Sequence, residues 1–151
     1  MTKRAAVLLP SQLRHLIRVT EATSRHPDRD ALILWLGFSC GMRVTETARL
    51  TVADVLMPSG LVRSEISLRA EITKGCRQRL AYLTNPKLIA AMDRYIEWRL
   101  AKRFGCSLDG RQYRGLMPKT RLILTWKGGP ERTQYQAGKE CGWRGCRIPG
   151  R

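Results

Sequence analysis

Apolar residues recur at helical spacing in the N-terminal part of the chain. Leu13, Leu16 and Ile17 fall on one face of a helix that is expected to follow Pro10 and to end near Pro27. The opposite face of this helix is polar, so the helix should lie at the periphery of the fold with its apolar face toward the core.

Residues 28–40 differ from the first helix because they are apolar nearly all round. A helix of this kind is buried on most sides, so we expect it to be the central helix of the core, closed by Gly41. A third, short helix is expected to follow, with Thr45 as its N-cap and Leu50 as its last residue.

The pattern changes to β between residues 51 and 83. The first strand is expected around Val52 and Val55, and a turn follows at residues 58–60. Residues 65–69 and 77–83 then alternate polar and apolar side chains on either side of Lys74. The whole region is therefore predicted to form a three-stranded antiparallel sheet with Lys74 at the tip of a hairpin.

Asn85 and Pro86 predict the start of a long helix, because a capping side chain stands directly before a proline at the first helical position. Residues 105–119 then read as a polar loop and residues 122–126 as a last strand or extended segment. The core face of the long helix should consist of Leu88, Met92, Tyr95, Ile96, Leu100 and Phe104.

These elements predict one α+β domain, mainly helical with a small three-stranded antiparallel sheet. Residues 1–10 would form a basic N-terminal segment and residues 11–130 the domain itself. From residue 131 to residue 151 the composition shifts to Gly, Arg, Lys and Cys with hardly an aliphatic residue to pack. We expect this tail to be disordered.

The charge of the chain points to a polyanionic partner. Its 151 residues include 28 Lys and Arg but only 12 Asp and Glu, which gives a net charge of +16. Such an excess favours nucleic acid, and double-stranded DNA in particular, as the partner. A basic protein of a membrane surface is the alternative, but here the charges are spread along the whole chain instead of lining one helix face.

The sequence shows no membrane span, export signal or clear metal site. The longest apolar run, residues 31–38, is far shorter than the ~20 residues that cross a bilayer. Five cysteines without a disulfide framework are typical of the reducing cytoplasm. Cys141 and Cys146 could supply half of a zinc site, but His15 and His26 lie far away along the chain. We therefore expect neither a metal nor a cofactor.

Residues 41–55, which read G-M-R-V-T-E-T-A-R-L-T-V-A-D-V, place an arginine directly after a helix break. Gly41 can adopt the positive φ that ends a helix, so Arg43 would project from a rigid corner. A guanidinium there could contact two phosphate oxygens at once and would stay charged at any working pH. A solvated Arg43, or one paired with Glu46, is the simpler interpretation of an arginine beside a helix end.

This segment resembles the first catalytic box of the tyrosine recombinases, the phage integrase family, in which a glycine turn presents an arginine to the scissile phosphate of DNA. The resemblance implies that Arg43 is a catalytic and DNA-binding residue and that Glu46 supports it. Residues 11–130 would then correspond to the first part of the catalytic domain.

Lys74 resembles the hairpin lysine of the same family, which is implicated as the general acid that protonates the 5′-hydroxyl leaving group. Arg77 and Arg79 follow it closely and are candidates for further DNA contacts. A hydrophilic hairpin tip without a catalytic role is the alternative for Lys74.

The chemistry implied by the resemblance is metal-free, and this chain holds only part of it. A tyrosine attacks the phosphate, and a second arginine from an H-x-x-R box helps to neutralise the developing charge. Here both histidines precede Arg43, so no such box can follow Lys74. Tyr113 and Tyr135 are the candidates for a substitute nucleophile, and neither lies in a recognisable box. A frameshift or premature stop in a longer gene would explain this pattern.

The sequence therefore predicts a DNA-binding fragment of a recombinase, concerned with DNA integration and recombination in the cytoplasm at the nucleoid, and catalytically incomplete by itself. A second copy or a full-length recombinase is the kind of partner that could supply the missing groups. A non-enzymatic DNA-binding regulator is the first alternative. An RNA-associated protein is the second, and it is less favoured because only Tyr82 places an aromatic ring in the predicted sheet.

Overall fold

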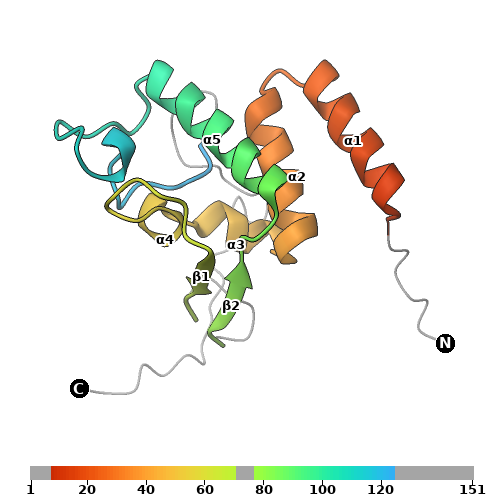
Figure 1. Cartoon of the computed structure of the whole chain (residues 1–151), viewed down its shortest axis with the longest axis horizontal. Helices are drawn as coiled ribbons and strands as arrows, with labels where there is room; N and C mark the ends of the chain where they lie inside the picture. Colours follow the sequence, from red (N-terminus) through yellow and green to blue (C-terminus); the bar gives the residue numbers. More distant parts are fainter. Residues whose placement is uncertain (1–7, 71–76, 125–151) are drawn as a thin grey trace, which may run out of the picture.

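The computed structural model describes residues 8–70 and 77–124 (Figure 1). The elements follow one another as α1 (Pro10–Thr23), α2 (Pro27–Cys40), α3 (Val44–Arg49), α4 (Val52–Val55), β1 (Glu65–Leu68), β2 (Arg79–Tyr82), α5 (Pro86–Ala101) and the 3-10 turn η1 (Tyr113–Gly115). Helices dominate this part of the chain, as the apolar periodicity predicted.

Helix α2 is the centre of the helical part. It packs against α1 on one side and α5 on the other (Figure 1), and Leu32 and Leu36 are fully buried between them. This confirms the predicted central helix and its last residue, Cys40. Its burial is not uniform, however, because Phe38 is 45% exposed. An apolar residue at the exposed end of a helix is common, since folded proteins keep much apolar surface.

Helix α1 is peripheral, as predicted, with Ile17 buried against the core and Leu13 partly buried. The helix ends at Thr23, before the predicted end near Pro27, because the backbone of Ser24 is extended. Leu16 was predicted on the buried face, but its side chain is exposed.

Helix α5 begins as the sequence predicts. Pro86 is its first residue, and the Asn85 side-chain oxygen accepts a hydrogen bond from the backbone N–H of Lys87 at 3.0 Å. Leu88, Met92, Tyr95 and Ile96 are buried on its core face, whereas Phe104 lies beyond the end of the helix at Ala101.

The prediction of a three-stranded sheet is wrong, because its first strand is not formed. Within residues 8–70 and 77–124 the sheet consists of β1 and β2, which pair antiparallel with Glu65 opposite Tyr82 and Leu68 opposite Arg79. Val52 and Val55, which were expected in the first strand, instead lie in the helical turn α4.

The reason for α4 is local. Asp54 accepts hydrogen bonds from the backbone N–H and the hydroxyl of Thr51, at 2.8 and 2.7 Å, which forms a capping box. Val52 and Val55 are spaced so that one helical turn buries both side chains fully.

The segment after α5 covers the core as irregular chain. Leu122 and Ile123 are buried in it, and Arg121 forms an isolated antiparallel bridge with Thr51. The predicted last strand at residues 122–126 is not formed in the described part of the chain, which bends at residues 122 and 123, while residues 125 and 126 lie outside that part. The loop before it was predicted to be polar, yet Leu116 is 1% exposed and belongs to the core.

No described helix is long and apolar enough to span a bilayer. Residues 1–7 of the predicted basic segment, residues 1–10, and the tail of residues 131–151 lie outside the described residues.

Candidate functional site: the Arg43 corner

The corner between α2 and α3 is set by one glycine. Gly41 has φ +61° and ψ +30°, the left-handed conformation that ends α2, and its N–H donates to the carbonyl of Leu36. Arg43 then takes an extended conformation as the N-cap of α3, so the cap lies two positions before the predicted cap at Thr45. Arg43 is therefore held at a turn between two helices, as its position after Gly41 predicted.

Glu46 holds Arg43 in place from inside the fold. Its carboxylate oxygen Oε2 accepts the backbone N–H of Arg43 at 2.9 Å, and Oε1 lies 3.4 Å from Arg43 Nη1. The Glu46 side chain is fully buried, whereas 57% of the Arg43 side chain is exposed. Glu46 thus fixes the Arg43 backbone, while much of the Arg43 side chain is open to solvent.

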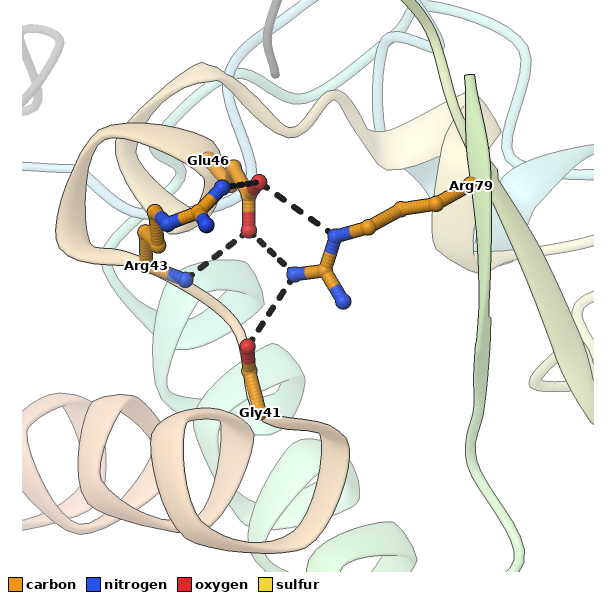
Figure 2. Close-up of polar contacts among 4 residues, drawn as sticks. All are labelled: Gly41, Arg43, Glu46 and Arg79. Atoms are coloured by element: carbon orange, nitrogen blue, oxygen red, sulfur yellow. Dashed lines mark hydrogen bonds and ion pairs between the residues drawn. The ribbon is translucent and has the colours of Figure 1, made fainter. Parts of the chain in front are cut away.

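Arg79 reaches the same carboxylate from the sheet (Figure 2). Its Nη2 donates to Glu46 Oε2 and, at 3.0 Å, to the carbonyl oxygen of Gly41, and its Nε lies 3.4 Å from Glu46 Oε1. Arg79 therefore ties β2 to the corner that carries Arg43. Sequence reasoning named Arg79 as a DNA contact but missed this contact with Glu46.

The electrostatics of the corner leave it positive. Burial alone would raise the pKa of Glu46, but the hydrogen bonds from Arg79 and the Arg43 backbone, together with both positive charges, lower it below its ordinary value. Glu46 is therefore ionised at neutral pH. Two guanidinium groups share this one carboxylate, so the cluster of Arg43, Arg79 and Glu46 keeps one net positive charge. Arg43 is the more exposed of its two arginines.

Two further arginines, Arg69 and Arg77, lie at the end of the sheet where Arg79 begins β2. Lys74 lies outside the described residues, in the segment between β1 and β2. Arg77 is exposed just before β2. Arg69, which sequence reasoning did not select, directly follows β1, and its Nη2 lies 3.5 Å from Asp54 Oδ2. Arg69 could have been found in the sequence, because it precedes Lys74 as Arg77 and Arg79 follow it.

Of the two tyrosines considered as nucleophiles, the described structure includes only Tyr113. Tyr113 lies in η1, packs partly against the core, and its N–H donates to the carbonyl of Pro58 at 3.1 Å. Tyr135 lies outside the described residues, as do Cys141 and Cys146. Within residues 8–70 and 77–124, no three His, Cys, Asp or Glu side chains are grouped so that they could hold a metal ion.

Comparison with known proteins supports the fold. No protein-family model and no curated protein matches this sequence. Among solved structures, the fold is similar to the crystal structure of XerA recombinase, with a TM-score of 0.56 and 18% sequence identity. The match covers 87% of this chain and 38% of that chain. The chain therefore has a mainly helical fold that resembles part of a tyrosine recombinase and spans well under half the length of the solved protein.

Proposed function

We propose that this chain binds double-stranded DNA through the surface around Arg43, as the first part of a tyrosine recombinase catalytic domain. The observation that carries this proposal is the exposed Arg43 guanidinium, fixed at its base by the buried Glu46. A guanidinium held in this way loses little conformational entropy when it binds a phosphate and can donate two parallel hydrogen bonds.

The surroundings of Arg43 support binding to a phosphate. Arg79 shares Glu46 with Arg43, so the carboxylate does not cancel the charge of Arg43. Arg69 and Arg77 add charge at the neighbouring end of the sheet. The similarity to part of XerA recombinase supports the same interpretation at the level of the fold.

In this proposal Arg43 contacts the scissile phosphate and Lys74 approaches it from the segment between β1 and β2. Lys74 would protonate the leaving hydroxyl group if a nucleophile were supplied. The sequence contains no H-x-x-R after Lys74, since its histidines are His15 and His26. We therefore propose that the chain by itself binds DNA without cleaving it, and that any strand transfer requires a partner chain.

The test is an affinity series with duplex DNA at several salt concentrations. The logarithm of the association constant should fall steeply and linearly with the logarithm of the salt concentration, since each neutralised phosphate releases counterions. Affinity should vary little with base sequence, because phosphate contacts carry no sequence information.

Arg43→Ala should weaken binding only several-fold and reduce the salt slope by about 1, because Arg43 is one phosphate contact among several. Lys74→Ala should have a similarly modest effect. Arg111→Ala is the matched control, since Arg111 is an exposed arginine in the loop after α5. A flat salt dependence would refute DNA binding, and equal slopes for Arg43→Ala and Arg111→Ala would refute the proposed site.

A further inference from the structure

Helices α1 and α5 border a groove that the proposed DNA site does not use. Both helices pack on α2 (Figure 1), and the groove between them has a volume of about 430 Å³. Its apolar lining is made by Ile17 from α1, Trp35 from α2 and Ala90 from α5. Ala90 is exposed, whereas Ile17 and Trp35 are only 6% and 8% exposed, so a ligand would meet the Ala90 methyl group and the few accessible atoms of the other two side chains.

The rim of this groove is strongly basic. Arg14 and Arg18 come from α1, while Lys87 and Arg94 come from α5. Glu21 is the acidic residue in the lining, and it pairs with Arg94 across the groove at 2.8 Å. With this pair neutral, the other three cations of the described lining have no carboxylate opposite them within the groove.

The lining residues on each wall follow the spacing of one helix face. On α1 they are residues 14, 17, 18 and 21, and on α5 they are residues 87, 90 and 94. Residues with this spacing lie above one another on a helix, so each wall is a continuous strip. Two such strips above a central helix form a groove into which a further helix can pack its ridge of side chains.

We propose that the groove between α1 and α5 binds an acidic amphipathic helix of a partner protein. The apolar side chains of that helix would contact Ile17, Trp35 and Ala90, and its Glu or Asp residues would pair with Arg14, Arg18 and Lys87. This charge complementarity decides between occupants. A second copy of this chain, with a net charge of +16, is repelled by the rim.

Duplex DNA is complementary to the basic rim of the groove but not to its apolar lining. Its phosphates could contact the basic rim, but its apolar thymine methyl groups lie inside the major groove and cannot enter a groove lined by Trp35 and Ala90. An amphipathic helix satisfies both the charge and the apolar lining. The inference is therefore independent of the proposed DNA site at Arg43.

The probe is a synthetic helical peptide of about 20 residues with blocked ends, which has Leu on one face and Glu on the other faces. A peptide of identical composition with its Leu residues distributed around the helix is the control. In fluorescence anisotropy with the full chain, the amphipathic peptide should bind at least about tenfold more tightly, because only it can bury several Leu side chains together. Equal affinity of the two peptides would overturn the proposal.

Substitutions of Ala90 locate the binding. Ala90→Glu places a carboxylate in the groove and should reduce peptide affinity at least about tenfold. Ala101→Glu is the matched control, since Ala101 is an exposed alanine at the end of the same helix and does not line the groove. If both variants weaken peptide binding equally, the site is wrong.

Ala90→Trp fills the groove without a change of charge. It therefore tests whether the groove binds a protein helix or nucleic acid. It should abolish peptide binding and leave duplex affinity unchanged. A loss of duplex affinity together with peptide affinity would assign the groove to nucleic acid and overturn the proposal. Circular dichroism shows whether Ala90→Trp folds, and Ala90→Glu at this exposed helical position provides the test if it does not.

Discussion

Glu46 is the residue on which the geometry of the Arg43 corner depends. It is fully buried and receives hydrogen bonds from Arg79 and from both the backbone and the side chain of Arg43. Two elements that are distant in sequence, the start of α3 and strand β2, therefore meet at one carboxylate. A change in this side chain should affect both elements together.

Glu46→Gln keeps the size of the side chain but removes its negative charge, so the two guanidinium groups lose their shared counter-charge. We expect the free energy of unfolding to fall by about 1.5–3 kcal/mol, the range for a lost hydrogen bond to a charged group. Urea denaturation followed by circular dichroism measures this change. Glu97→Gln, at an exposed position of α5, should stay within about 0.5 kcal/mol of the original protein. Equal losses in the two variants would contradict the role of Glu46.

The same carboxylate should make stability depend on pH. Because the folded protein lowers the pKa of Glu46, the unfolded chain binds its proton more readily. The stabilisation by Glu46 should be complete above its ordinary pKa of about 4.3 and should be lost as the pH falls through the lowered pKa of the folded state. The difference in unfolding free energy between the original protein and Glu46→Gln should therefore shrink in acid. A difference that grows as the pH falls would contradict this assignment.

At the scale of elements, Arg99 joins α5 to the irregular chain that follows it. The Arg99 side chain is fully buried, and its Nη2 donates to the carbonyl of Phe104 at 3.2 Å. Its Nη1 donates to the carbonyls of Arg121 and Leu122 at 2.9 and 3.0 Å. Burial lowers the pKa of Arg99 from its ordinary value, but an arginine remains charged in this setting. Gly105 completes the contact, since a Cβ on it would lie 2.6 Å from Arg99 Nη2.

Arg99→Met should therefore release the chain after α5 from the helix. Its apolar side chain fills much of the space but leaves buried carbonyls without donors, which should cost about 3 kcal/mol or more. Thermal unfolding and amide hydrogen exchange of residues 104–122 measure the loss. Lys102→Met, at the exposed end of α5, is the control and should change stability little. Unchanged exchange in Arg99→Met would show that other contacts hold this segment.

At the scale of the whole molecule, the chain should bind DNA without forming a covalent bond to it. The phosphoryl transition state spreads negative charge over its oxygens, and loss of one stabilising donor costs about 3–4 kcal/mol in comparable reactions. Here both the second arginine box and a recognisable nucleophile are missing from the sequence. Incubation with a nicked suicide substrate, followed by denaturing electrophoresis, should show no protein attached to DNA.

The two tyrosines provide the controls for that experiment. A covalent band that disappears in Tyr113→Phe or Tyr135→Phe would identify a substitute nucleophile and contradict the proposed inactivity. A band that appears only when a full-length recombinase is added would instead support the requirement for a partner chain.

Features with a local cause were predictable from the sequence. The start of α5 follows from Asn85 and Pro86, and the end of α2 follows from Gly41, because capping and left-handed backbone depend on the residue itself and its near neighbours. The proximity of Arg43 and Glu46 is also local, since a carboxylate at the third helical position can accept the backbone N–H of the N-cap residue. These local rules were enough to place the Arg43 corner.

Features that depend on distant partners were decided only by the tertiary structure. Arg79 contacts Glu46 although 33 positions separate them, and no local pattern distinguishes this arginine from one that faces solvent. Val52 and Val55 have a spacing that a short strand also tolerates, and only the packed core shows that both side chains are buried by the helical turn α4, which the local Thr51–Asp54 capping box begins. The burial of Arg99 and the groove between α1 and α5 likewise require the packed helices. Sequence periodicity determined the helices, whereas packing between elements decided which of their charged side chains are buried, paired or presented to a partner.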